Sequence, residues 1–329
     1  LKKVMMLGWQ PNKHLPGNYM TAPFANISLA TNARDKKLFA QQLGENILAC
    51  GFCGITDHSI NPNLIDEVMH IFEAFFALPR NTKMIYCDRK LKGARGYTPM
   101  SIETPKDSTH PDFKEFWHVG RELAVNHEFA KWMHRNKEVY EIKNFQENTN
   151  ALFTQFDELG QTLLEAIAIF LDLNEDYFVT HAGQGNSLMR AIHYPPIKEN
   201  NSAERAGPHE DINLITLLLG GHQRGLELLN KQGHWEKIAV SRDVVICNIG
   251  DMLQRFTNHY LPSTTHRVAK SGSNTTKSRY SIPFFVHPNP DWQIKTLASC
   301  ISDDRPDRYP EPIMAEDFLE QRRKEIKLA

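Results

Sequence analysis

Apolar and polar side chains repeat with two different periods along this chain, and the period changes near residue 188. Residues 34–50, 61–78 and 148–173 carry apolar side chains at i, i+3 and i+4 spacing, which predicts three amphipathic helices. Downstream, short runs rich in β-branched and aromatic residues are separated by turn residues and predict a series of strands. These strands are expected at residues 188–194, 212–219, 225–230, 235–240, 243–250, 263–270 and 278–288.

Two more strands are predicted near the N-terminus, at residues 24–29 and 51–59, on either side of the first helix. Two strands cannot form a stable sheet alone, so we expect them to join the downstream strands. Residues 81–118 are rich in Lys, Gly, Pro and Thr and are interpreted as a loop, whereas residues 315–326 return to a helical pattern.

These elements predict a mostly β fold with flanking helices, of the α+β class, built on a sandwich, jelly roll or barrel. We expect residues 1–329 to form one unit. Within it we expect a helix-rich part over residues 1–185, a β core over 186–300 and a C-terminal helix within 301–329.

The charge balance argues against a nucleic acid as partner. The chain has 38 Lys and Arg against 39 Asp and Glu, so no basic excess is available to neutralise a phosphate backbone. Its apolar runs are too short and too interrupted to span a membrane. The first residues lack the apolar core of a signal peptide, so we expect a cytoplasmic location; because the sequence begins with Leu, the native N-terminus stays open.

The cysteines do not form a disulfide framework, because there are five of them at scattered positions. Cys50 and Cys53 have the spacing of a redox pair. A redox pair normally opens a helix after a strand, whereas here a helical pattern leads into a strand. We therefore interpret both as buried structural cysteines at a helix-to-strand junction.

The residues with the clearest chemistry are His209 and Asp211, one position apart in a segment with strand character. Strand residues at i and i+2 project to the same side, so the imidazole and the carboxylate are expected to point together. His266 lies in a second predicted strand. Two histidines and one carboxylate with open positions are the ligand set of non-haem Fe(II) oxygenases.

A candidate acid-binding pair follows. Arg279 and Ser281 are again at i and i+2 of a predicted strand, and a guanidinium beside a hydroxyl suits bidentate binding of a carboxylate. Tyr194 could donate a phenolic hydrogen bond to the same acid or be a half-buried aromatic. Arg190 could be a second acid-binding group or be structural.

At these residues the chain resembles the 2-oxoglutarate- and Fe(II)-dependent oxygenases of the isopenicillin N synthase-like family. The resemblance rests on His209-x-Asp211, His266 and Arg279-x-Ser281 with their flanks, HEDINLITLLL, RGLELL, VICNIGDMLQRFTN and RYSIPFFVHPNPD. It extends to ACGFCGITDHSI, FFALPRNTK and ARGYTP in the N-terminal half, so it covers nearly the whole chain.

The resemblance implies a double-stranded β-helix (jelly-roll) core with the site at one open end. It implies that His209, Asp211 and His266 bind Fe(II), and that Arg279 and Ser281, assisted by Tyr194, hold the distal carboxylate of 2-oxoglutarate. It also implies a dioxygenase that uses O2, with ascorbate as a supporting reductant. Such an enzyme hydroxylates, desaturates or cyclises a small organic substrate and releases succinate and CO2.

Two alternatives stay open at this point. Isopenicillin N synthase-like and aminocyclopropane carboxylate oxidase-like Fe(II) oxidases carry a similar Arg-x-Ser pair without using 2-oxoglutarate. A non-catalytic metal-binding jelly roll would need a fourth protein ligand. The remaining histidines of this region are interpreted as loop or surface residues, namely His222, His234, His259 and His287. The charged stretch from Asp88 to Arg95 hints at a polar, amino-acid- or peptide-like substrate.

Overall fold

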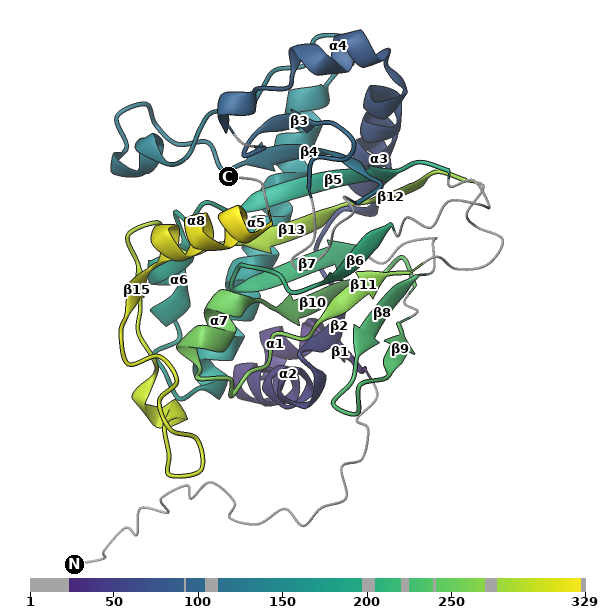
Figure 1. Ribbon diagram of the computed structural model, residues 1–329. Helices are drawn as coiled ribbons and strands as arrows, with labels where there is room; N and C mark the ends of the chain where they lie inside the picture. The colour runs from purple at the N-terminus through teal and green to yellow at the C-terminus, as the bar shows by residue number, and fades with distance from the viewer. Residues whose placement is uncertain are drawn as a thin grey trace, which may run out of the picture.

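A large and a small β-sheet, with helices packed around them, make up the described part of the chain (Figure 1). The computed structural model describes residues 24–91, 93–103, 112–196, 205–219, 225–238, 241–269 and 277–326. The large sheet has nine strands, and β12 (Arg279–Ser281) pairs with its strand β5 off the main path. The other eight strands run in the order β1 (Asn26–Ser28), β2 (Phe52–Thr56), β10 (Val245–Ile249), β7 (Ile215–Leu219), β13 (Pro283–Val286), β5 (Leu188–Tyr194), β4 (Glu115–Gly120) and β3 (Gly96–Thr98).

The small sheet has four strands, β6 (Ala206–His209), β11 (His266–Val268), β8 (Leu226–Leu229) and β9 (Trp235–Lys237), in that order. In its antiparallel register, His266 stands opposite His209. A separate pair is formed by β14 (Gln293–Ile294) and β15 (Ile313–Met314). The mixed sheets agree with the mostly β class predicted from the sequence, and strands from both halves of the chain share the large sheet.

Helices cover the outer face of the large sheet, and the longest, α5 (Phe145–Phe170), contacts β4, β7 and β13. Its Phe156 ring stacks on Phe284 of β13 with centroids 5.3 Å apart, within one continuous core of buried apolar residues. The other helices are α1 (Ala30–Arg34), α2 (Lys36–Cys50), α3 (Pro62–Ala77), α4 (Arg80–Ile85), α6 (Tyr177–Ala182), α7 (Asp251–Phe256) and α8 (Ala315–Glu325). Short 3-10 turns occupy Arg89–Leu91, Glu128–Lys131 and Ala298–Cys300.

The three helices predicted from apolar spacing are confirmed as α2, α3 and α5, and Asn61 caps α3 by accepting from the Asn63 amide. The loop predicted over residues 81–118 is wrong in part, because this segment holds most of α4, all of β3 and most of β4. Its residues 92 and 104–111 lie outside the described residues. Every residue of β4 is buried, and its polar Glu115 and His118 are satisfied by distant partners. A strand buried on both faces shows no alternation, which is why its sequence did not reveal it.

Cys50 is the last residue of α2 and Cys53 lies in β2, so the predicted helix-to-strand junction is confirmed. Cys53 is buried, whereas Cys50 is only half-buried, and both are free thiols. Burial raises the pKa of Cys50. A hydrogen bond with Cys247 on the neighbouring strand β10, together with burial, raises the pKa of Cys53. A reactive redox pair requires a lowered thiol pKa, which is the opposite of this environment.

Candidate active site

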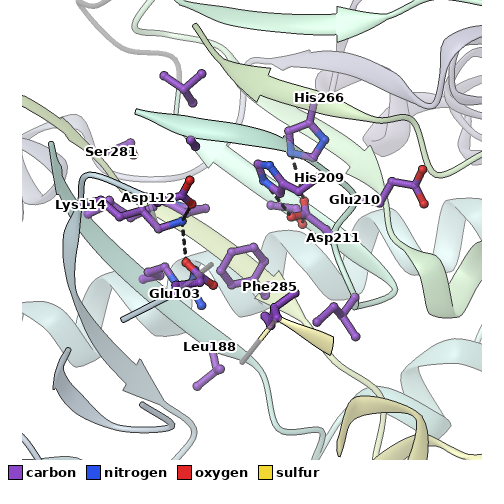
Figure 2. Close-up of a pocket in the computed structure, with 18 of the residues that line it drawn as sticks. Glu103, Asp112, Lys114, Leu188, His209, Glu210, Asp211, His266, Ser281 and Phe285 are labelled. Carbon is purple, nitrogen blue, oxygen red and sulfur yellow. Dashed lines mark hydrogen bonds and ion pairs between the residues drawn. The ribbon is translucent and has the colours of Figure 1, made fainter. Parts of the chain in front are cut away.

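Three potential metal ligands meet at one end of the small sheet (Figure 2). His209 ends β6, His266 begins β11, and Asp211 lies just beyond β6. Their ligand atoms all lie within 4.8 Å of one another: Asp211 Oδ1 is 4.0 Å from His209 Nε2, and Asp211 Oδ2 is 3.8 Å from His266 Nε2. The sequence therefore identified three side chains that the fold brings together.

The placement of Asp211 in a strand is wrong, because β6 ends at His209 and β7 begins only at Ile215. The carboxylate is fixed in this connection by hydrogen bonds rather than by strand alternation. Its Oδ2 accepts from Thr216 Oγ1 at 2.6 Å and from Asn248 Nδ2 at 2.9 Å, and its backbone carbonyl accepts from the Asp251 amide at 2.7 Å. Burial alone would raise the pKa of Asp211, but the neighbouring histidines and these donors hold it below its ordinary value, so the group is an anion.

Backbone carbonyls orient both imidazoles. His209 Nδ1 lies 2.8 Å from the Gly207 carbonyl and His266 Nδ1 lies 3.1 Å from the Thr264 carbonyl. A carbonyl only accepts, so each Nδ1 donates the hydrogen bond and each Nε2 is turned to the centre of the cluster. Burial and the nearby His266 lower the pKa of His209 to about 4, which keeps this imidazole neutral. Two imidazoles and one carboxylate fit a ferrous ion.

Arg279 and Ser281 lie on β12, at i and i+2 as predicted, and both line the cavity that contains the metal-ligand cluster. Arg279 is 6% exposed, and its Nε and Nη1 have no hydrogen-bond partner. No carboxylate of the described residues forms an ion pair with it. Tyr194, on β5, is also buried, and its ring centroid lies 5.1 Å from the Arg279 guanidinium carbon. A buried cation with unused donors fits an acid such as 2-oxoglutarate.

The cavity has a volume of about 1100 Å³ and lies between the two sheets. Its wall includes alternate residues of β5, with Leu188, Arg190, Ile192 and Tyr194 all facing inward. The helix α8 contributes Leu319 and Arg322, and Arg322 forms an ion pair with the buried Asp251 at the start of α7. This ion pair ties the C-terminal helix to the segment that supports Asp211.

A network of charged residues that the sequence did not reveal lies across the cavity from the metal ligands (Figure 2). Lys114 Nζ lies 2.5 Å from Glu103 and 2.7 Å from Asp112, and Arg190 Nη1 lies 3.2 Å from Glu103. Arg190 also donates from Nε to His118 Nε2 at 2.6 Å. Arg190 was left open as an acid-binding group or a structural residue. The structure favours the structural role, because Arg190 is already paired within the protein.

The sequence suggests that His287 is a loop or surface histidine, and the surface position is wrong. It follows β13, but it is 6% exposed, lines the cavity, and its Nδ1 has no partner. Burial, reinforced by Arg323, lowers the pKa of His287 to about 4. His222 lies outside the described residues, whereas His234 is exposed and His259 is half-buried beside Tyr309.

Comparisons with known proteins agree with this geometry. Residues 185–288 match the profile of the 2OG-Fe(II) oxygenase superfamily, and residues 22–141 match that of the N-terminal part of non-haem dioxygenases in morphine synthesis. A 2-oxoglutarate-Fe(II) type oxidoreductase, hxnY of Emericella nidulans, is 32% identical over 88% of this chain and 85% of its own length. The chain belongs to the 2OG-Fe(II) oxygenase superfamily. Azadirone synthase LFS of Melia azedarach is 31% identical to this oxygenase over 82% of the chain and 84% of its own length.

Solved structures extend the similarity to the fold. A 2OG-Fe(II) oxygenase family protein from Caulobacter crescentus superimposes on this oxygenase with a TM-score of 0.86 and 44% identity, covering 93% of this chain and 100% of that one. A full-length Neurospora crassa protein, solved in complex with alpha-KG, gives a TM-score of 0.80 and 25% identity, covering 94% and 98% of the two chains. A further structure of that Neurospora protein contains both alpha-KG and thymine.

The oxygenase is therefore a 2-oxoglutarate-dependent Fe(II) dioxygenase with a jelly-roll core, as its sequence predicted. The relatives named as 2-oxoglutarate-dependent dioxygenases favour this activity over the oxidases that do not use 2-oxoglutarate. None of the helices in the described ranges is long and apolar enough to cross a membrane. The cytoplasmic location stays a prediction.

Proposed function

We propose that this oxygenase hydroxylates a small polar organic molecule, with Fe(II) bound by His209, Asp211 and His266. The cluster supports this assignment because its three ligand atoms converge and no fourth candidate ligand joins them among the described residues. A closed structural metal site would normally have four protein ligands. We further propose that residues 1–329 act as one catalytic unit, in line with the strands that both halves of the chain contribute to the large sheet.

In this proposal Arg279 and Ser281 bind the distal carboxylate of 2-oxoglutarate, and Tyr194 contacts the same group. The observation that carries the assignment is the buried Arg279 guanidinium, with two unpartnered nitrogens, in the wall of the cavity that contains the metal-ligand cluster. A guanidinium without an anion in such a place is costly, and a bound dicarboxylate offsets that cost.

When bound, iron and 2-oxoglutarate supply the oxidising chemistry: O2 and 2-oxoglutarate give succinate and CO2, while one oxygen atom enters the substrate as a hydroxyl group. The Gly207 and Thr264 carbonyls accept from the two Nδ1 atoms and turn both imidazoles toward the centre of the cluster. Thr216 and Asn248 hold the Asp211 carboxylate in one orientation. The residues that line the cavity orient the substrate beside the metal-ligand cluster.

A polar substrate, of amino-acid or peptide-like character, is supported by the charged wall opposite the metal ligands. The ion pairs of Glu103 with Lys114 and Arg190 make this wall polar, beside the apolar surfaces of Leu188 and Phe285. The Neurospora crassa protein that has been solved with thymine is a structural neighbour with a small polar ligand.

The test is an assay of the purified full chain with Fe(II), ascorbate and 2-oxoglutarate, in which succinate and O2 consumption are measured together. We expect succinate to form in proportion to O2 consumed, and we expect Asp211→Ala and His209→Ala to abolish it. Oxygen consumption without succinate would instead support an oxidase that does not use 2-oxoglutarate. Unchanged turnover in either variant would refute the proposed metal site.

A further inference from the structure

Arg95 is a second cavity arginine without a carboxylate partner among the described residues. It is 1% exposed. Its Nη1 donates at 2.8 Å to the carbonyl of its own neighbour Ala94, its Nη2 reaches Asn186 Oδ1 only at 3.4 Å, and its Nε has no partner. Burying a guanidinium is unfavourable unless an anion offsets the lost hydration. Burial lowers the pKa of Arg95 to about 10, which still leaves it charged at neutral pH.

Other cations that line the cavity have acids of their own. Lys114 and Arg190 share Glu103, and Arg322 pairs with Asp251. The acid with the strongest influence on Arg95 is Glu122. Its two oxygens, however, face elsewhere: Oε1 accepts from the Asn136 amide and Oε2 lies 3.6 Å from Arg135. Arg279 lacks a carboxylate in the same way as Arg95, and 2-oxoglutarate accounts for it.

The backbone is shaped to hold the Arg95 guanidinium in place. Arg95 lies against Gly120, the last residue of β4, where a Cβ atom would overlap the guanidinium. Asn136 clamps this glycine by accepting from its amide and donating to its carbonyl, each at 2.8 Å. The absence of a side chain at Gly120 therefore makes room for the guanidinium at the wall of the cavity.

Arg95 lies at the end of the cavity away from the proposed 2-oxoglutarate site. Antiparallel pairing puts Tyr194 opposite Arg279 at one end of β5 and Leu188 opposite Phe285 at the other. Six residues of strand separate the two ends, a length of about 20 Å. Gly120, on which Arg95 rests, is the register partner of Leu188. One acid cannot occupy both ends, so Arg95 is available for a second one.

We propose that Arg95, together with the Asn186 side chain, binds a carboxylate group of the substrate. The substrates of this oxygenase are then small organic acids whose apolar part lies on Leu188 and Phe285, between the carboxylate and the metal-ligand cluster. This inference rests on the proposed function, because it assumes that the molecule to be oxidised enters this cavity. Among the charges that act on Arg95, Arg323 adds to the positive potential at this end and Glu122 offsets part of it.

The experiment compares acids with their neutral amides on the intact protein. Anaerobic protein with Fe(II) and saturating 2-oxoglutarate is titrated with benzoate, phenylacetate, cyclohexanecarboxylate and octanoate, and with the primary amide of each, by calorimetry. Saturating 2-oxoglutarate keeps the Arg279 end of the cavity occupied. That 2-oxoglutarate stays bound during the titration is checked in the same sample. We expect at least one acid to bind at least about tenfold more tightly than its amide, as a charge-assisted hydrogen bond provides.

Arg95→Met is expected to remove this preference while amide binding changes little, and Arg95→Lys to retain part of it. Gly120→Ala keeps the charge but displaces the guanidinium, so it should weaken acid binding and serves if Arg95→Met does not fold. Arg255→Met is the matched control, because Arg255 also has an unpartnered Nε but does not line the cavity. It should keep the full preference.

Three results would overturn the inference: acids and amides binding alike, no acid of the panel binding, or a preference that survives Arg95→Met. The proposed function is judged separately, by the formation of succinate from 2-oxoglutarate in the wild type. A wild type that forms succinate but shows no acid preference would refute only the role of Arg95. A wild type that prefers acids but forms no succinate would refute only the proposed oxidation.

Discussion

Tyr194 and Arg279 are direct register partners on β5 and β12, and the Arg279 guanidinium carbon lies 5.1 Å from the Tyr194 ring centroid. We expect Arg279→Met to raise the KM for 2-oxoglutarate, because a charge-assisted pair with the carboxylate is worth about 1.5–3 kcal/mol, or about 10- to 150-fold. Arg279→Lys keeps a charge but loses the bidentate geometry. Its KM for 2-oxoglutarate should therefore lie between those of the wild type and Arg279→Met. Initial rates of succinate formation against 2-oxoglutarate concentration measure the effect.

The control for this prediction is Arg242→Met, which removes an exposed arginine paired with Asp66 outside the cavity. It should leave the KM for 2-oxoglutarate unchanged. If Arg279→Met retained the wild-type KM, the acid at this end of the cavity would have to be held by other groups.

Asn248 orients a metal ligand without touching the metal position itself, since its Nδ2 donates to Asp211 Oδ2. Residues of this kind typically change metal affinity by about 10- to 100-fold, so we expect Asn248→Leu to weaken Fe(II) binding by that amount. Anaerobic titration with Fe(II) or Co(II) gives the affinity without relying on turnover. Asn148→Leu is the control, because Asn148 lies on α5, donates to Glu67 of α3 and does not line the cavity. Equal affinities for Asn248→Leu and the wild type would contradict a role for Asn248 in orienting Asp211.

The residues that the sequence revealed are those whose neighbours in the chain decide their direction. Arg279 and Ser281 share a face because they alternate within one strand, and His266 lies in another strand as predicted. Lys114 and Glu103 were missed because their relation to Arg190 depends on which strands pair. The pairing of β4 with β5 joins residues more than seventy positions apart, such as His118 with Arg190. No local period in the sequence encodes that register.

Asp211 shows how a correct prediction can have a wrong local reason. The one-residue spacing from His209 suggested strand alternation, but the connection after β6 is irregular. What fixes the carboxylate is Thr216 and Asn248, one on the following strand and one on β10. The motif was therefore predictive because the family resemblance includes it, and the geometry that makes it work is tertiary.

Glu115 supplies a prediction about pH. This carboxylate is buried and accepts from Lys83 at 2.8 Å, Tyr97 at 2.5 Å and His193 at 2.8 Å. Burial alone would raise the pKa of Glu115, but these partners together hold it below the ordinary value of 4.5. A group with a lowered pKa in the folded state stabilises the fold fully above its unfolded pKa. That stabilisation is lost as the pH falls through the folded value.

We therefore expect Glu115→Gln to lower the free energy of unfolding at pH 7 by about 3–5 kcal/mol, because it leaves Lys83 buried without its acid. The difference in unfolding free energy between Glu115→Gln and the wild type should shrink as the pH falls below 4.5. There the wild-type Glu115 carboxylate begins to lose its stabilising contribution. Urea denaturation at pH 7 and at pH 4 measures both values. Glu175→Gln, in an exposed pair with Lys36, should change stability by about 1 kcal/mol or less. A difference in unfolding free energy between Glu115→Gln and the wild type that is larger at pH 4 than at pH 7 would show that Glu115 is not the titrating group.

Gly51 and Gly233 form a matched pair for testing how backbone packing supports the metal-ligand cluster. Both have positive φ, 75° and 79°, so alanine at either position carries a similar conformational cost of about 1 kcal/mol. A Cβ at Gly233 would meet nothing within 4 Å, whereas one at Gly51 would lie 2.5 Å from Thr264 Oγ1 and 2.6 Å from the Pro262 carbonyl. Gly51→Ala must therefore displace the segment that leads to His266.

Because the Thr264 carbonyl orients His266, this displacement should affect both stability and metal binding. We expect Gly51→Ala to cost about 2–4 kcal/mol of unfolding free energy, since overpacking adds about 1–3 kcal/mol to the backbone strain. We also expect weaker Co(II) binding in that variant, whereas Gly233→Ala should lose about 1 kcal/mol and bind metal normally. Thermal denaturation of the metal-free proteins and Co(II) titration separate the two effects. If both variants lost the same stability and bound Co(II) alike, the Gly51 contact with the Pro262–Thr264 segment would not be what holds His266 in place.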